Sequence, residues 1–451
     1  MNATVQAVVD RRGPLFVIRG SVLILRLEYQ ATVHKNCASF LAANIFAQHC
    51  TQMPVASPIP GARPQSCPVF YPGEWETNRS LKPKRILVRA TNWVGDAVMS
   101  LPALAAIRDR FPQAHIAILA RPWVAGLYRH EPFADEIIPY QPARFERGTF
   151  RQAWHDRMSV AGALRQGSFD CALLLQNAFD AALVTALAGI PERIGYARDM
   201  RSPLLTRPIE RPRAGAIPPH ESFYYLELLR RAGWLDRLPE TLLVEMRSAP
   251  RARVAGLKRF AADEIVKPVI GVSPGAAFGT AKRWLPERFA EAACTLAQRL
   301  NAVVALHGSA SERELCEAVK TQISAGGIEA VNYAGQTTLE EFIERAAASV
   351  LFLSNDSGAM HIASALGVPT VAIFGATNPA TTGPAGRSSR IVRQPVECSP
   401  CMLRECPIDH RCMTRVPQEK VSQVAIDLLQ MAVEWIPEVK SSNCQSGIPP
   451  R

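Results

Sequence analysis

Two segments of this chain combine the residue types that hold a phosphate group. Lys282 follows a glycine-containing turn at 275–281, and a string of small polar residues, Ser-Asn-Asp-Ser-Gly-Ala-Met-His, fills 354–361. Each segment follows an apolar run of the kind that forms a buried strand, at 269–272 and at 349–353. Ligands of open α/β sheets bind beyond the carboxyl ends of the strands, where a helix N-terminus offers free N–H groups and partial positive charge to an anion. The residues therefore predict a site for a phosphorylated, nucleotide-bearing ligand.

The polar residues of these segments have chemical roles that follow from their types. When a nucleoside diphosphate departs, negative charge develops on its phosphate, and a lysine such as Lys282 stabilises that transition state more than the ground state. Thr280 can donate a hydrogen bond to a phosphate oxygen, while Ser357 and Gly358 allow close approach of the backbone. Asp356 is expected to cap or orient the next helix, or to contact a donor sugar. The plain alternative for Lys282 is a solvated surface residue.

Two further residues lie at predicted strand ends or just inside a helix. His361 falls one turn into the helix that follows the polar string, and its motif favours a role in the cleft over the more usual core or surface position. Ser309 ends the string His307-Gly308-Ser309 after another apolar run. It can contact the ribose or base of a nucleotide, and a tight turn between a strand and a helix is the alternative.

A carboxylate near the start of the chain's regular part is the candidate base. Gly95 and Asp96 follow the apolar run 85–90 and precede a helix predicted over 97–111. An aspartate there can simply cap the helix, which contributes about 0.5–2 kcal/mol. It can also take the proton that an acceptor hydroxyl must lose as its oxygen forms a new bond. The string Asn-Trp-Val-Gly-Asp at 92–96 resembles that of glycosyltransferase family 9, and this resemblance implies that Asp96 is the base and that Gly95 contacts the substrate.

These motifs resemble those of one known family. Lys-Arg-Trp at 282–284 and Asn-Asp-Ser-Gly-x-Met-His at 355–361 are similar to the ADP-heptose:lipopolysaccharide heptosyltransferases of glycosyltransferase family 9. The string Asn-Trp-Val-Gly-Asp-Ala-Val-Met-Ser-Leu-Pro at 92–102 resembles the type II members in particular. The likeness covers about residues 84–435. It implies transfer of L-glycero-D-manno-heptose from ADP-heptose, with inversion, onto the first heptose of the lipopolysaccharide inner core.

The resemblance also implies partners and leaves alternatives open. The acceptor would be a lipid A-core glycolipid at the inner leaflet of the cytoplasmic membrane, and no cofactor would be required for catalysis. A related transferase with another acceptor, either a type I heptosyltransferase or a surface-glycan transferase, is the first alternative. A non-catalytic nucleotide-sugar-binding protein would need neither Asp96 nor Lys282, and both are present. A nucleotide-sugar epimerase on the same fold would need no acceptor groove.

The order of apolar runs predicts the fold class. From residue 84 short apolar runs alternate with amphipathic stretches, which is typical of βαβ units and parallel sheets. The alternation lapses around 245–267 and then restarts. We therefore expect an α/β protein of the GT-B architecture, in which two Rossmann-like domains face each other across a cleft. The acceptor-binding domain would span 81–255, and the nucleotide-sugar-binding domain 256–436.

The two ends of the chain lack the alternating pattern of this regular part. Residues 1–80 lack sustained periodicity and contain a proline-rich stretch at 54–61, so we expect a disordered or spurious extension, with a folded module as the alternative. Residues 437–451 are expected to form a flexible tail.

Composition limits the partners and the location. The net charge of +11 favours anionic partners, such as membrane surfaces and phosphorylated glycolipids. No nucleic-acid-binding motif accompanies the scattered basic residues, so nucleic acid is not expected. There is no uninterrupted apolar run of about 18 residues, and the apolar stretch 16–27 is broken by Arg19 and Arg26. We expect a cytoplasmic protein that can contact the inner membrane peripherally.

Four of the eleven cysteines gather in one segment, as Cys398-x2-Cys401-x4-Cys406-x5-Cys412. Four thiolates can hold a tetrahedral Zn²⁺ or an iron–sulfur cluster, and in a reducing compartment metal binding is favoured over disulfides. The spacing is irregular for a zinc ribbon, so reduced thiols or a redox pair are the alternatives. Any metal here is expected to be structural rather than catalytic.

Overall fold

The chain divides into two compact units, Met1–Asn78 and Arg79–Arg451. The computed structural model describes residues 6–10, 13–17, 83–146 and 148–434. In the first unit the described part is an antiparallel hairpin of β1 (Gln6–Asp10) and β2 (Gly13–Val17). The remaining residues of the predicted extension 1–80 lie outside the described residues. The predicted tail 437–451 lies outside them too.

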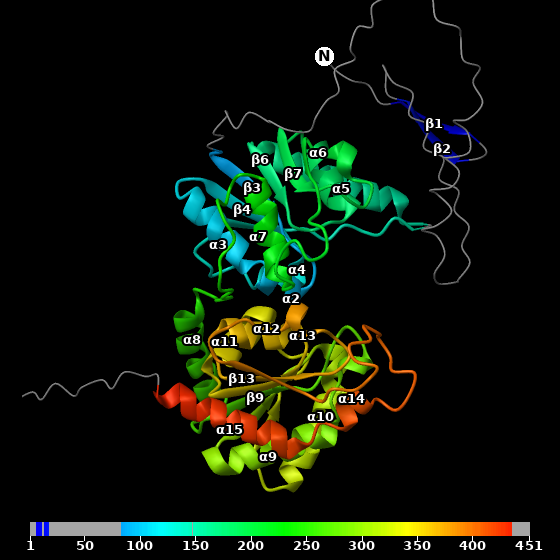
Figure 1. Ribbon diagram of the computed structural model, residues 1–451. Coiled ribbons are helices and arrows are strands. Elements are labelled where there is room, and N and C mark those ends of the chain that lie inside the picture. The colour runs from blue at the N-terminus through cyan, green and yellow to red at the C-terminus, as the bar shows by residue number, and fades with distance from the viewer. Residues whose placement is uncertain (1–5, 11–12, 18–82, 147, 435–451) are drawn as a thin grey trace, which may run out of the picture. The chain divides into compact units, whose positions relative to one another are not determined.

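The first sheet of the second unit has six parallel strands in the order β5-β4-β3-β6-β7-β8 (Figure 1). Its inner strands are almost wholly apolar because helices cover both faces, as parallel sheets require. The strands are β3 (Arg85–Arg89), β4 (His115–Ala120), β5 (Glu136–Pro139), β6 (Cys171–Leu174), β7 (Glu192–Tyr196) and β8 (Arg207–Ile209). The helices are α2 (Val94–Met99), α3 (Leu101–Arg110), α4 (Pro122–Ala125), α5 (Phe150–Gln166), α6 (Phe179–Leu187), η1 (Ser202–Leu204) and α7 (Glu221–Arg231).

The second sheet repeats this plan, with parallel strands in the order β11-β10-β9-β12-β13-β14 (Figure 1). Its strands are β9 (Val269–Ser273), β10 (Val303–Leu306), β11 (Ala330–Asn332), β12 (Leu351–Asn355), β13 (Thr370–Phe374) and β14 (Ser389–Arg393). Its helices are α8 (Ala249–Ala262), η2 (Thr280–Lys282), α9 (Pro286–Leu300), η3 (Ala310–Glu312), α10 (Arg313–Ala325), α11 (Leu339–Ala348), α12 (Gly358–Ala365), α13 (Pro379–Thr382), α14 (Arg411–Thr414) and α15 (Gln418–Glu434).

Both sheets have the doubly wound strand order of Rossmann-like domains. In sequence terms each reads 3-2-1-4-5-6, and the order reverses between the first and the fourth strand. In the second sheet these two strands are β9 and β12, which precede the two predicted phosphate-binding segments. The predicted α/β class with two parallel sheets is confirmed, while the domain boundaries 81–255 and 256–436 stay predictions.

The helix predicted over 97–111 is in fact two helices. The chain enters α2 at Val94 and leaves it after Met99, where the Ser100 hydroxyl donates to the Ala97 carbonyl at 2.7 Å. Pro102 then lies in the first turn of α3, where its missing N–H costs nothing. Because α2 starts early, Asp96 lies inside its first turn, so the capping interpretation of Asp96 is wrong.

Candidate active site

A cleft of about 710 Å³ is lined by residues that follow strands of both sheets. It is formed where α2 of the first sheet contacts α12 of the second. Among the predicted catalytic and substrate-binding residues, Thr280 is the one outside the lining, and it is exposed on η2, so its phosphate contact stays a prediction. The other predicted residues all line this cleft: Gly95, Asp96, Lys282, Ser309, Asp356, Ser357, Gly358 and His361.

Lys282 is held in place by an aspartate from the next strand. Its Nζ lies 2.7 Å from Oδ2 of Asp356, whose side chain is 4% exposed. The Thr377 hydroxyl donates to the same oxygen at 2.6 Å. Lys282 Nζ also lies 4.8 Å from the centre of the Phe278 ring. Asp356 therefore orients Lys282, and Ser357 rather than Asp356 is the N-cap residue of α12.

The backbone after Lys282 is fixed to the end of β12. The Asn355 side chain accepts from the Trp284 N–H at 2.9 Å and donates to the Pro274 carbonyl at 2.8 Å. The buried Trp284 ring donates from Nε1 to the Val416 carbonyl at 3.1 Å. These bonds explain the spacing of the two motifs, since Asn355 joins the turn before Lys282 to the strand that carries Asp356.

The N-terminus of α12 lies close against the first domain. Ser357 is the N-cap residue, and Gly358 is the first helical residue. A Cβ on Gly358 would approach the Val94 side chain to 3.0 Å, and one on Gly95 would approach the His361 ring to 3.1 Å. A Cβ at either position would force the Val94 or His361 side chain to shift, so the close contact between α2 and α12 favours glycine at both. The free N–H groups of α12 remain a suitable partner for an anion.

Burial sets the protonation of the two titratable groups nearest this contact. It raises the pKa of Asp96 to about 6, and the positive charge of Lys282 opposes the rise. Burial also lowers the pKa of His361 to about 4, so that its ring is neutral at physiological pH. A carboxyl with a pKa near 6 is ionised at neutral pH yet basic enough to accept a proton, as a general base must be.

Glu221 is a site residue that the sequence analysis missed. It is the first residue of α7, and burial together with the negative charge of Asp96 raises its pKa to about 7. No motif surrounds it, and the residues before it, Pro218-Pro219-His220, indicate only a turn. Its position beside Asp96 depends on the contact of α7 with α2, which sequence does not reveal.

Ser309 and His307 are more constrained than the sequence suggested. Ser309 forms a capping box with Glu312, and its hydroxyl donates to Glu312 Oε2 at 2.8 Å. His307 is 2% exposed and stacks on Tyr333 at 5.7 Å, and burial lowers its pKa to about 3. The tight-turn interpretation of Ser309 is therefore part of its role, and contact with a nucleoside stays a prediction.

The four-cysteine metal site is not supported. Across the described part of the chain, no three His, Cys, Asp or Glu side chains are grouped to hold a metal ion. Cys412 is buried against Gly375, and the nearby His410 ring is bonded to the Ala281 carbonyl at 3.0 Å. The other three thiols are partly buried and unbonded to one another: Cys398, Cys401 and Cys406.

The cysteine-rich segment instead packs on the turn that carries Lys282. The Ala281 N–H donates to the Arg404 carbonyl at 3.0 Å, and a Cβ on Gly279 would approach that carbonyl oxygen to 2.2 Å. The segment thus supports the shape of the turn, and glycine at 279 is needed for its close approach.

Comparison with known proteins agrees with this geometry. The profile of glycosyltransferase family 9 (heptosyltransferase) matches residues 157–411. Lipopolysaccharide heptosyltransferase 2 of Escherichia coli K12 is 33% identical over 329 residues, which cover 68% of this chain and 88% of that protein. Lipooligosaccharide heptosyltransferase 2 of Campylobacter jejuni is 27% identical over 345 residues, which cover 75% of this chain and 96% of that protein.

The solved structure of E. coli ADP-heptose lipopolysaccharide heptosyltransferase II superposes with a TM-score of 0.64 at 30% identity, covering 77% of this chain and 99% of that one. The structure of a family 9 glycosyltransferase from Veillonella parvula gives a TM-score of 0.65 at 22% identity. The match covers 77% of this chain and 97% of that one. These matches confirm the predicted GT-B fold class. The family match, the identity to the E. coli enzyme and the shared fold agree, and the chain belongs to glycosyltransferase family 9, the heptosyltransferases.

Proposed function

We propose that the protein transfers L-glycero-D-manno-heptose from ADP-heptose onto the first heptose of the lipopolysaccharide inner core. The observation that carries this proposal is a single cleft that joins a carboxyl with a pKa of about 6, Asp96, to an oriented lysine, Lys282. The similarity to enzymes named lipopolysaccharide heptosyltransferase 2 supports the identity of donor and acceptor.

The proposed reaction is one displacement with inversion at the anomeric carbon. Asp96 takes the proton of the acceptor hydroxyl as that oxygen bonds to the anomeric carbon of the donor heptose. The bond between this carbon and the diphosphate oxygen breaks through an oxocarbenium-like transition state, and ADP leaves with the bonding electron pair. Lys282 and the N–H groups at the start of α12 stabilise the charge that develops on the diphosphate.

This mechanism draws its positive charge from the protein. Lys282 is 13% exposed and aligned by Asp356, so it needs little reorganisation when the diphosphate departs. The proposed steps therefore use no metal and no other cofactor. The segment with the four cysteines contributes by supporting the turn of Lys282, whether or not it carries a zinc ion or an iron–sulfur cluster.

We propose further that the enzyme works at the cytoplasmic face of the inner membrane, where it contacts the leaflet that holds the lipid A-core acceptor. None of the described helices is long and apolar enough to cross a bilayer. One face of α5 carries Phe150, Trp154 and Met158, which are 57%, 41% and 43% exposed, at a spacing of four residues. Phe145 lies 5.5 Å from Phe150, and Arg151 is exposed beside them. Aromatic residues next to basic ones suit the interface of an anionic leaflet.

The test is transfer by purified protein to defined core acceptors, with the product mass measured. We expect the mass of one heptose to be added to an acceptor that ends in a single heptose, and nothing to be added to an acceptor without heptose. Transfer to the heptose-free acceptor would identify a type I enzyme. Binding of ADP-heptose without transfer would indicate a nucleotide-sugar-binding protein, and conversion of the free nucleotide sugar would indicate an epimerase.

A further inference from the structure

A second polar region lies on the first sheet, beyond the ends of β7 and β8. Two adjoining shallow hollows of about 430 and 380 Å³ share the side chains of Arg198, Arg211 and Arg213. The second hollow continues to the half-buried Glu221, whose pKa is raised by burial and by the nearby charge of Asp96. The region therefore lies near the side of the cleft that holds the proposed base.

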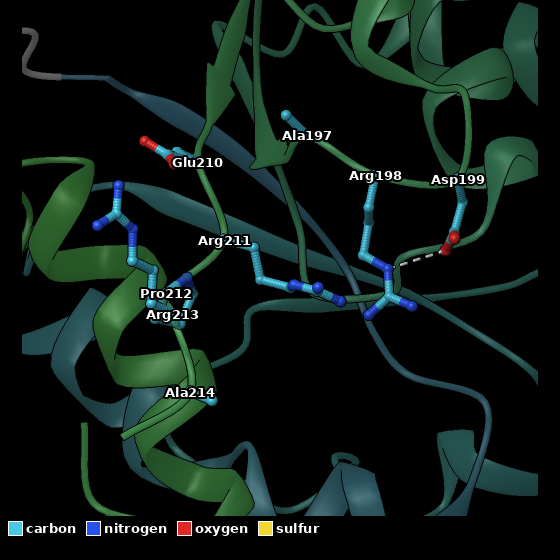
Figure 2. A pocket seen from close by; sticks show the side chains of 8 residues that line it. All are labelled: Ala197, Arg198, Asp199, Glu210, Arg211, Pro212, Arg213 and Ala214. Carbon is cyan, nitrogen blue, oxygen red and sulfur yellow. Dashed lines mark ion pairs between the residues drawn. The ribbon is translucent and has the colours of Figure 1, made fainter. Parts of the chain in front are cut away.

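The charges in this region are incompletely balanced. Figure 2 shows the Arg198 and Arg211 side chains extending toward each other, while Glu210 points away from both. Arg198 Nε lies 3.2 Å from Asp199 Oδ2. For Arg211 no carboxylate lies within ion-pairing distance among the residues that the structure describes. Two guanidinium groups that extend toward one point can both donate hydrogen bonds to an anion placed between them.

Strand geometry gives the distance from this region to the base. Asp96 follows β3, and the strand order β3-β6-β7-β8 places β7 two positions away and β8 three. Neighbouring strands lie about 4.8 Å apart, so the arginines lie on the order of 10–14 Å from the base along the same sheet edge. That distance exceeds the width of one sugar ring.

We propose that Arg198 and Arg211 bind an anionic group of the acceptor, a phosphate or a carboxylate, carried by a sugar next to the accepting one rather than by the accepting sugar itself. Arginine suits this task because its planar guanidinium bonds both kinds of group in a bidentate manner. The donor diphosphate has its own cation, Lys282, on the other sheet. The proposal rests on the proposed transferase function and specifies how its acceptor is recognised.

The experiment compares three acceptors with the wild-type enzyme and with Arg198→Ala and Arg211→Ala. One acceptor is the intact core glycolipid, one is dephosphorylated, and one has its carboxylates esterified. We expect each variant to raise the KM for the intact acceptor roughly tenfold, since it removes a charge-assisted contact. The kcat and the KM for ADP-heptose should stay unchanged. The acceptor that abolishes the difference between variant and wild type identifies the anion.

Arg207→Ala is the matched control. Arg207 begins β8 at the opposite edge of the sheet and lies 3.5 Å from Glu192, so its removal should leave every KM unchanged. Arg211→Lys should restore part of the lost affinity, because lysine keeps the charge without the bidentate geometry. Unchanged KM values in both alanine variants would overturn the proposal. Equal losses with all three acceptors would overturn it too, because they would indicate a structural effect.

Calorimetry without donor separates this proposal from the transferase function. Weaker binding of the intact glycolipid to Arg211→Ala than to wild type would support the arginine site, even if the wild-type enzyme transferred no heptose and the proposed function had failed. Equal binding to both proteins, or none to either, would overturn the arginine site whatever the transfer assay shows.

Discussion

The two sheets share one strand order but present different chemistry at their carboxyl edges. On the second sheet the site is a network centred on Asp356. Its Oδ2 accepts a hydrogen bond from the Thr377 hydroxyl and forms an ion pair with Lys282. On the first sheet the site is a half-buried carboxyl, Asp96, whose pKa is raised to about 6 because partial burial disfavours its charge. The lysine proposed to meet the leaving diphosphate is thus oriented before the reaction, while ionisation of the carboxyl proposed to meet the acceptor costs free energy.

This difference matches what each half must do. The negative charge of the transition state develops at a fixed position on the departing diphosphate. Donors that are already oriented toward that position before the reaction therefore stabilise the transition state most. A base must instead hold a proton loosely enough to ionise and strongly enough to accept one. The shared fold places both groups at the reversal of strand order or beside it, and the local residues decide which task each sheet performs.

Removing the base should give the greatest loss. Asp96→Asn keeps the shape of the side chain but cannot accept a proton, so we expect kcat to fall on the order of 10²-fold or more. The affinity for ADP-heptose should barely change, because the proposed diphosphate site lies on the other sheet. Steady-state kinetics with calorimetry of ADP-heptose binding checks this, and a variant with wild-type turnover would remove Asp96 from the mechanism.

The same variant should be more stable than the wild type. The pKa of Asp96 lies near 6 in the folded protein against 3.8 ordinarily, so the folded state binds the proton more tightly. Ionisation therefore costs stability as pH rises from about 4 to 6, and the full cost of up to about 3 kcal/mol is present above that window. Denaturant unfolding at pH 7.5 should show Asp96→Asn stabilised, with the difference vanishing near pH 4. A destabilised variant at pH 7.5 would contradict the burial argument.

Removing the lysine should weaken donor binding and slow the chemical step together. A charge-assisted contact is worth about 1.5–3 kcal/mol, so Lys282→Ala should lose about 10- to 100-fold in ADP affinity. Asp356→Asn should have a smaller effect of the same kind, because it leaves the cation but loosens its orientation. Calorimetry of ADP binding and single-turnover rates measure both. Unchanged affinity and rate in Lys282→Ala would show that the diphosphate binds elsewhere.

The sequence was sufficient where function depends on strand ends. Lys282 and Ser357 follow strands that begin with apolar runs, so their place at one sheet edge could be predicted without coordinates. Thr377 and Glu221 could not be found in this way, because each reaches the site through tertiary contacts and carries no motif. The helix break at Ser100 depends on one proline in an otherwise helical pattern.

The cysteine segment shows the limit of spacing as evidence. Four cysteines in fifteen residues match the ligand set of a metal site, but spacing says nothing of where each thiol points. In the structure Cys412 turns into the core against Gly375, and the segment packs on the turn at Ala281. The contact of this segment with the turn at Ala281 is a structural role that residue types and spacing alone did not indicate.

The pH profile links the two halves directly. Asp96 must be ionised to act as a base, so kcat/KM should rise about tenfold per pH unit up to about pH 6 and then level off. Because the charge of Lys282 lowers the pKa of Asp96, Lys282→Ala should move the midpoint to higher pH. Glu221→Gln is the control for the other carboxyl, whose pKa lies near 7, and should leave the rising limb in place. A midpoint that stays fixed or falls in Lys282→Ala would mean that the two halves are not electrostatically coupled.

The smallest expected effect concerns the outer surfaces of the two halves. If the exposed face of α5 contacts the membrane, Trp154→Ser should reduce binding to vesicles that contain anionic phospholipid by a few-fold, since one interfacial aromatic residue contributes about 1 kcal/mol or more when its apolar area is buried. Leu257→Ser on α8 is the matched control, because Leu257 is 52% exposed but lies outside that face, and it should leave vesicle binding unchanged. Transfer to a short acceptor without lipid should be equal in both variants. Equal vesicle binding by wild type and Trp154→Ser would leave the α5 face without a membrane role and confine the acceptor contacts to the cleft and the arginine region.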